Sequence, residues 1–137
     1  MTQCPNCGRV VKATSEGFCQ QCIREIDPEA RMLVLAMNKL PGIQTFESCW
    51  GHGRDQFRVW FAAETPDDVA VLIDLIETCE WPQGERWIIE PWMDLPDQYI
   101  LRSRDRTSAT YGQSRMIAVA IRGVASPSSA TPLTNPD

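Results

Sequence analysis

The first apolar pattern in the chain is helical. Asp27 is suited to cap a helix that begins at Pro28, because an aspartate side chain can accept a hydrogen bond there and proline fits the first position. Apolar residues then recur at helical spacing until Pro41 and Gly42 interrupt them. The pattern predicts a helix over residues 28–40.

A second helix begins after Thr65. Threonine is a good cap, Pro66 suits the first helical position, and two aspartates follow in the first turn, where they interact favourably with the helix dipole. The apolar stripe of this helix is formed by Val69, Leu72, Ile73 and Ile76. We expect the helix to end near Cys79.

Four other segments have the composition or alternation of half-buried strands. The first pair covers residues 45–50 and 57–63, joined by a glycine-rich loop, and the second covers residues 87–92 and 98–104. Each pair is close enough in sequence to form a hairpin.

Residues 108–122 fit two interpretations. Residues 116–121 have the composition of a strand, but the apolar residues also fit one face of a helix, with Gly123 as its stop. We favour the helix. Residues 124–137 are rich in Ser, Pro, Thr and Ala, and we expect a disordered tail.

This order of elements predicts an α+β protein. An N-terminal zinc ribbon over residues 1–26 is followed by a helix and a ββαββα domain over residues 27–123, in which two ββα units share an antiparallel four-stranded sheet with the helices on one face. The first 26 residues hold too few apolar residues to fold around a core, so we expect metal to stabilise them.

Two Cys-x-x-Cys pairs supply the predicted metal ligands, Cys4 with Cys7 and Cys19 with Cys22. Four thiolates in a tetrahedral array favour zinc over an iron site or a redox dithiol, and they leave no open coordination position. We therefore expect one structural Zn²⁺. The segment resembles a zinc ribbon, a family that implies docking to proteins or nucleic acid and no particular activity.

A second motif surrounds the single histidine of the chain. The run from Glu47 to Arg54 holds Cys49 and His52, with His52 between two glycines. Residues 41–61 resemble a family of small, mostly uncharacterised bacterial and phage proteins with an E-S-C-x-G-H-G run, which implies a phage or mobile-element accessory role by analogy. Here Cys79 alone stands where that family has a cysteine-rich turn.

Three explanations of this motif remain. Cys49 and His52 could bind a second metal together with Cys79 or Asp55, or they could form a thiolate–imidazole pair in a ligand or substrate site. The commoner explanation is structural, with glycines that allow a tight loop and a small buried thiol at Cys49. Cys79 continues the apolar stripe of its helix, which favours a packed core thiol.

The charge distribution restricts the choice of partners. The chain has a net charge of -5, and residues 31–98 carry five basic and twelve acidic groups, so we do not expect a general phosphate binder. The exception is the alternating set of Arg102, Arg104 and Arg106, which on a continuing strand would share a face and could meet nucleic acid or an acidic partner. A solvated strand face is the commoner explanation.

These observations favour a non-enzymatic, zinc-binding protein that acts through protein–protein interaction. Five tryptophans are many for 137 residues, and any that is exposed near the His52 loop would mark a binding surface. The alternatives are a nucleic-acid-associated regulator and a small enzyme or ligand-binding protein centred on Cys49 and His52. The longest apolar run is too short for a membrane span, and polar residues follow Met1, so we expect a cytoplasmic protein.

Overall fold

A four-stranded antiparallel sheet in the order β3-β4-β6-β5 forms the centre of the fold. The computed structural model describes residues 2–3, 10–11, 26–81 and 84–125. The strands are β3 (Ile43–Cys49), β4 (Arg58–Ala63), β5 (Ile88–Pro91) and β6 (Gln98–Arg102). Each predicted hairpin forms, and β4 pairs with β6 to join them. The predicted α+β class with an antiparallel four-stranded sheet is confirmed.

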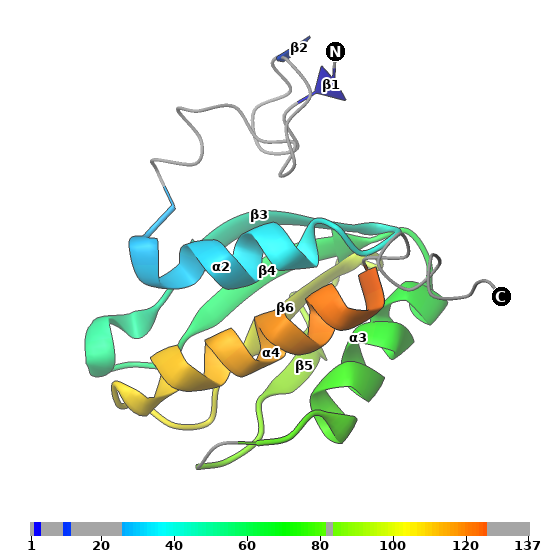
Figure 1. Ribbon diagram of the computed structural model, residues 1–137. Coiled ribbons are helices and arrows are strands. Elements are labelled where there is room, and N and C mark those ends of the chain that lie inside the picture. Colours follow the sequence, from blue (N-terminus) through cyan, green and yellow to red (C-terminus); the bar gives the residue numbers. More distant parts are fainter. Residues whose placement is uncertain (1, 4–9, 12–25, 82–83, 126–137) are drawn as a thin grey trace, which may run out of the picture.

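Three helices lie side by side on one side of this sheet (Figure 1). They are α2 (Pro28–Met37), α3 (Pro66–Thr78) and α4 (Ala109–Ala125), and α4 contacts both of the others. The helical interpretation of residues 108–122 is confirmed. The prediction that Gly123 stops this helix is wrong, because α4 continues through it, and a glycine in a helix costs only about 1 kcal/mol.

The hydrophobic core fills the space between the sheet and the helices. On β4, Val59 and Phe61 are fully buried, whereas Arg58 and Trp60 are half-buried and point to the other side of the sheet. The helices contribute Leu33, Met37, Leu72, Ile117 and Ile121. Ile73 was predicted in the buried stripe of α3, but its exposed fraction is 42%, because it lies at the edge of that stripe.

The helix ends are fixed by side-chain hydrogen bonds. The predicted cap at Thr65 is confirmed, since its hydroxyl accepts a hydrogen bond from the Asp68 N–H while the Asp68 carboxylate accepts one from the Thr65 N–H. α2 ends three residues before the predicted position. There the Asn38 amide donates to the Val34 carbonyl and to the Thr45 hydroxyl, both at 2.7 Å, which ties the end of the helix to β3.

Near the N-terminus, β1 (Thr2–Gln3) pairs with β2 (Val10–Val11) in an antiparallel arrangement. The four predicted zinc ligands, Cys4, Cys7, Cys19 and Cys22, lie outside the described residues. The predicted disordered tail over residues 124–137 begins too early, because α4 includes Val124 and Ala125, and residues 126–137 lie outside the described residues. In the part of the chain that the structure describes, no helix has the length and apolar character needed to cross a membrane.

Candidate metal centre

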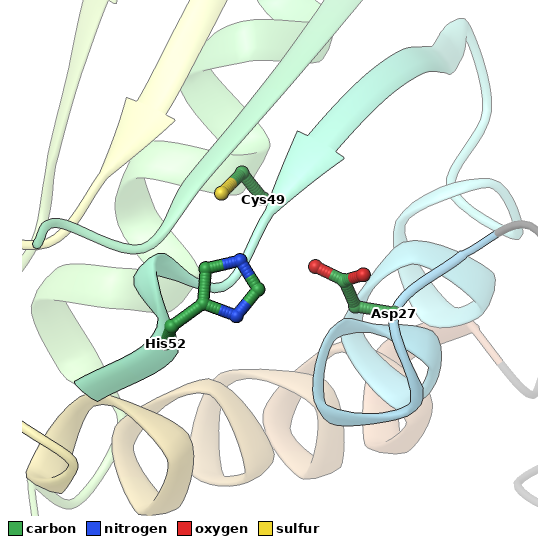
Figure 2. A group of neighbouring side chains, drawn as sticks. All are labelled: Asp27, Cys49 and His52. Atoms are coloured by element: carbon green, nitrogen blue, oxygen red, sulfur yellow. The ribbon is translucent and has the colours of Figure 1, made fainter. Parts of the chain in front are cut away.

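Asp27, Cys49 and His52 come together at one edge of the domain (Figure 2). Each offers one donor atom, a carboxylate oxygen, the thiol sulfur or an imidazole nitrogen, and these three atoms all lie within 4.8 Å of one another. They come from the residue just before α2, the end of β3 and the loop that follows β3. Asp27 and Cys49 are half-buried, and His52 is exposed.

The loop that carries His52 has an unusual backbone. The short 3-10 turn η1 (Gly51–Gly53) has positive φ at all three residues, 82° at Gly51, 55° at His52 and 76° at Gly53. Left-handed backbone is costly for a residue with a side chain, and it concentrates at functional sites. The two glycines therefore let the chain turn sharply enough to place the imidazole beside Cys49.

Gly51 has a further steric reason to be glycine. A Cβ atom at this position would lie 2.6 Å from the carbonyl oxygen of Gln56. The Gly51 carbonyl accepts hydrogen bonds from the N–H groups of Arg54 and Asp55, both at 3.0 Å. These contacts close the loop just behind His52.

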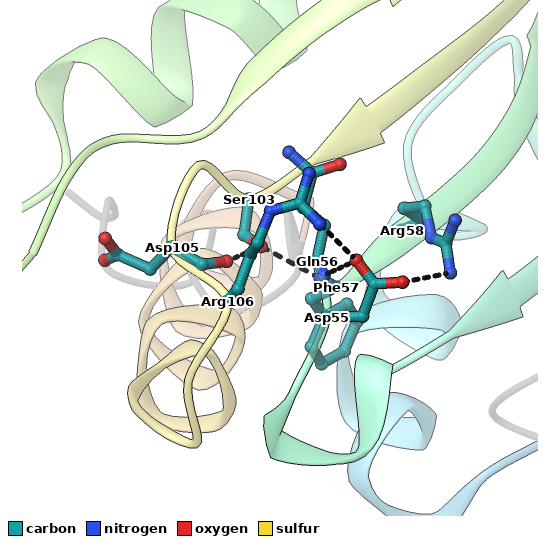
Figure 3. A network of polar contacts seen from close by, with 7 residues as sticks. All are labelled: Asp55, Gln56, Phe57, Arg58, Ser103, Asp105 and Arg106. Atoms are coloured by element: carbon teal, nitrogen blue, oxygen red, sulfur yellow. Dashed lines mark hydrogen bonds and ion pairs between the residues drawn. The ribbon is translucent and has the colours of Figure 1, made fainter.

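Asp55 holds the loop against two other segments (Figure 3). Its carboxylate accepts hydrogen bonds from the Gln56 N–H at 2.7 Å and from the Arg106 guanidinium at 3.0 Å, and it lies 3.6 Å from the Arg58 guanidinium. The Gln56 N–H is the main cause that lowers the pKa of Asp55. Partial desolvation opposes this effect, and the two arginines add to it. Asp55 is thus ionised over a wider pH range than an ordinary aspartate.

The strand that leaves the loop is anchored by Ser103. Its buried hydroxyl accepts a hydrogen bond from the Phe57 N–H and donates one to the Asp105 carbonyl, both at 2.8 Å (Figure 3). The loop is therefore fixed on both sides, which pre-organises His52.

Asp27 does not cap α2 through its side chain, so this prediction is wrong. The residue has the N-cap position in the backbone, and its carbonyl accepts a hydrogen bond from the Ala30 N–H at 2.9 Å, but its carboxylate makes no capping hydrogen bond. The carboxylate faces His52 and Cys49 instead (Figure 2). Packing of α2 against β3 causes this contact, which a cap pattern in the sequence does not reveal.

The convergence of the three donors favours a metal site over a catalytic relay. In a nucleophile–imidazole–carboxylate relay the nucleophile and the carboxylate bind opposite nitrogens of the ring, so they are roughly 7 Å apart. Here the sulfur and the carboxylate oxygen are within 4.8 Å of each other and of the same histidine nitrogen. Three donor atoms this close together could hold one metal ion.

Cys79 and Asp55, the two other metal ligands that the sequence suggests, are not in the group of Asp27, Cys49 and His52. Cys79 lies just after α3, where its thiol donates to the Ile76 carbonyl at 3.6 Å. It is half-buried and is not among the core residues that the structure describes, so the prediction of a packed core thiol is wrong. The Asp55 carboxylate forms ion pairs with Arg58 and Arg106. Among the described residues, Asp27 is the third member of the donor group with Cys49 and His52. The sequence does not indicate this role, because an aspartate before a proline is typical of a helix start.

The three arginines after residue 100 do not form one basic face. β6 ends at Arg102, so Arg104 and Arg106 are not on a continuing strand as predicted. Arg102 binds Glu90 at 2.9 Å, Arg104 lies 3.9 Å from Glu85, and Arg106 binds Asp55. Each guanidinium has a carboxylate partner, which reduces the positive charge available to phosphate.

The tryptophans are divided between the core and the surface. Trp87 is buried, with its indole N–H donating to Gln113 at 2.8 Å. Trp60 contacts Trp92 edge-on at 5.7 Å on the side of the sheet away from the helices. Trp50 is half-buried beside the candidate metal centre, and its ring lies 5.6 Å from that of His52.

Comparison with known proteins gives no match to a family model, to a curated protein or to a solved structure. The resemblances noted for the two cysteine-containing motifs therefore remain predictions.

Proposed function

We propose that this chain is a zinc-binding protein in which Asp27, Cys49 and His52 hold a zinc ion, in addition to the predicted four-cysteine site. The observation that supports the proposal is the mutual approach of three different donor atoms to within 4.8 Å. A zinc–ligand bond is about 2.0–2.3 Å long, so ligands on one tetrahedral ion are separated by about 3–4 Å. Small side-chain rotations bring the three atoms to that separation.

The donor set suits zinc by its chemistry. Thiolate, imidazole and carboxylate are the three side-chain ligands that zinc uses in proteins. Three protein ligands leave a fourth tetrahedral position for water or another ligand, which distinguishes this centre from the closed four-cysteine site. The thiolate and the carboxylate balance the double charge of the ion, so the loaded centre is electrically neutral.

Zinc content per chain tests the proposal. The purified full-length protein is expected to hold two zinc ions per chain after dialysis against metal-free buffer. His52→Ala is expected to hold one, because two remaining ligands bind zinc much more weakly. Cys79→Ala is the matched control, since its thiol is outside the group and its removal leaves both ions in place.

Elemental analysis and native mass spectrometry both give this count. One zinc in the wild type that His52→Ala does not change would refute the second centre. Circular dichroism of each variant shows whether the fold is retained.

Protein docking is a second candidate function, supported by the sheet surface opposite the helices. We define the open sheet face as Arg58 and Trp60 of β4, Ile100 and Arg102 of β6, Glu90 of β5, and Trp92. The strand register aligns Trp60, Ile100 and Glu90 across the sheet. The Arg58 guanidinium lies 5.6 Å from the centre of the Trp60 ring. Tryptophan and arginine are the residues most enriched at protein-binding hot spots.

A paired substitution tests this second candidate. Trp60→Ala with Trp92→Ala is expected to abolish capture of a protein partner from host lysate. Val71→Ala with Ile73→Ala, on the exposed side of α3, serves as the control. Equal capture of the same partner by both variants would reject the open sheet face as the docking surface.

A further inference from the structure

A hollow of about 230 Å³ lies beside the candidate metal centre. Its lining consists of Pro28, Glu29, Trp50, Ser108 and Tyr111. Two of these directly follow the proposed ligands Asp27 and Cys49 in the chain, and the Trp50 ring contacts the His52 ring. The hollow is therefore built by the same segments that hold the donor atoms, together with the start of α4.

The size of the hollow limits what it can hold. Pockets for drug-sized ligands measure about 300–1,000 Å³. A hollow of about 230 Å³ suits a smaller molecule, or one side chain of a larger partner. We therefore expect a compact ligand, with one end at the metal and the other at the opposite wall of the hollow.

The charge of the lining favours a cation. With zinc bound, the centre itself is neutral, so the Glu29 carboxylate is the unbalanced charge of the lining. Glu29 is half-buried and forms no ion pair or hydrogen bond with another residue that the structure describes. The aromatic rings of Trp50 and Tyr111 also attract cations.

Arg115 is a basic residue that contacts this lining. Its guanidinium lies 5.7 Å from the centre of the Tyr111 ring and donates to the Tyr111 hydroxyl at 3.3 Å. It is not part of the lining, so it does not neutralise Glu29 by direct contact. Tyr111 already has one cation at its ring, which leaves Trp50 as the main aromatic surface for a ligand.

We propose that this hollow binds a small primary amine that carries a zinc-binding group, with the ammonium next to Glu29 and the zinc-binding group on the open coordination position. This inference rests on the proposed zinc centre, which supplies that position. Beyond the zinc centre itself, it names the class of ligand, and it assigns Glu29 as the residue that favours an amine over a neutral ligand.

Two thiols, one with an ammonium group and one without, test the inference. Cysteamine carries a thiol and an ammonium group, whereas 2-mercaptoethanol has a neutral hydroxyl in its place. Both are titrated into full-length protein loaded with Co²⁺ instead of Zn²⁺, and the visible spectrum reports a new thiolate on the open position. His52→Ala, loaded in the same way, supplies the spectrum of the four-cysteine site alone for subtraction.

The ammonium group also makes the cysteamine thiol more acidic, so the informative quantity is the ratio of the two affinities, compared between the wild type and Glu29→Gln. The inference predicts that Glu29→Gln lowers this ratio about tenfold, corresponding to one charge-assisted contact, while the metal content stays the same. A ratio that is unchanged in Glu29→Gln would overturn it.

The two proposals fail in different ways. If the second metal ion is absent, the metal count falls to one and the proposed function fails. If two ions are bound but Glu29→Gln does not change the ratio of the two thiol affinities, the zinc centre stands and the amine pocket is rejected.

Discussion

At the scale of single residues, the backbone of Gly51, His52 and Gly53 decides where the imidazole lies. Three consecutive residues with positive φ are costly unless glycine occupies most of them, and here two of the three are glycine. The sequence predicts a tight loop from these glycines. It does not predict the direction of His52, because that depends on the contacts behind the loop.

Replacement of Gly51 by alanine is expected to cost about 3 kcal/mol of folding free energy. The left-handed backbone accounts for about 1–2 kcal/mol, and the rest comes from the new Cβ atom, which would lie 2.6 Å from the Gln56 carbonyl oxygen. Urea denaturation of both proteins measures the difference.

Gly53→Ala is the control for this prediction. Its φ is similar, 76°, but its Cβ atom would lie 3.7 Å from the nearest atom of Ser108, an ordinary contact. We expect it to cost about 1 kcal/mol. Equal losses for the two variants would show that the contact with Gln56 is unimportant.

At the scale of elements, α4 shows why the sequence left residues 108–122 ambiguous. Its buried positions recur at helical spacing, and they are Thr110, Gln113, Ser114, Ile117, Ala118 and Ile121. Half of this face is polar, so only its second half has an apolar pattern, and a short apolar run fits a strand as well as a helix. Gln113 is tolerated inside because Trp87 and Asp105 satisfy its amide.

Gln113→Ala is therefore expected to destabilise the protein by about 2–3 kcal/mol. The change leaves the buried indole N–H of Trp87 without its acceptor and opens a small cavity. Arg122→Ala, on the exposed side of the same helix, should change the free energy of unfolding by less than about 0.5 kcal/mol. Thermal or urea unfolding that gives the same value for both variants would contradict the role of Gln113.

The contact of Asp55 with two arginines joins the loop after β3 to the segment between β6 and α4. The pKa of Asp55 is lowered in the folded protein, so this residue binds fewer protons there than in the unfolded chain. The contribution of Asp55 to the free energy of unfolding is therefore present above about pH 4, and it is lost as the pH falls through the pKa of Asp55 in the folded protein.

Asp55→Asn should therefore lower the urea midpoint at pH 7 and have a smaller effect at pH 3. Asp94→Asn, at an exposed aspartate in a turn, is expected to change neither midpoint. A loss for Asp55→Asn that is equal at both pH values would mean that its charge is irrelevant.

At the scale of the whole molecule, hydrophobic periodicity predicts the fold well and the metal centre only in part. The order of helices and strands follows from local patterns, and each hairpin joins neighbours in the sequence. The pairing of β4 with β6 and the packing of α2 beside the end of β3 are long-range contacts. Asp27 joins Cys49 and His52 through the second of these contacts, so its role could not be predicted from residue spacing.

X-ray absorption at the zinc edge distinguishes two zinc centres with different ligands from a single four-cysteine centre. Four thiolates at one ion and a single thiolate at the other predict an average of about 2.5 sulfur ligands per zinc, with nitrogen and oxygen making up the rest. An average of about four sulfur ligands per zinc would contradict the account, because it would leave the predicted four-cysteine site as the sole zinc centre.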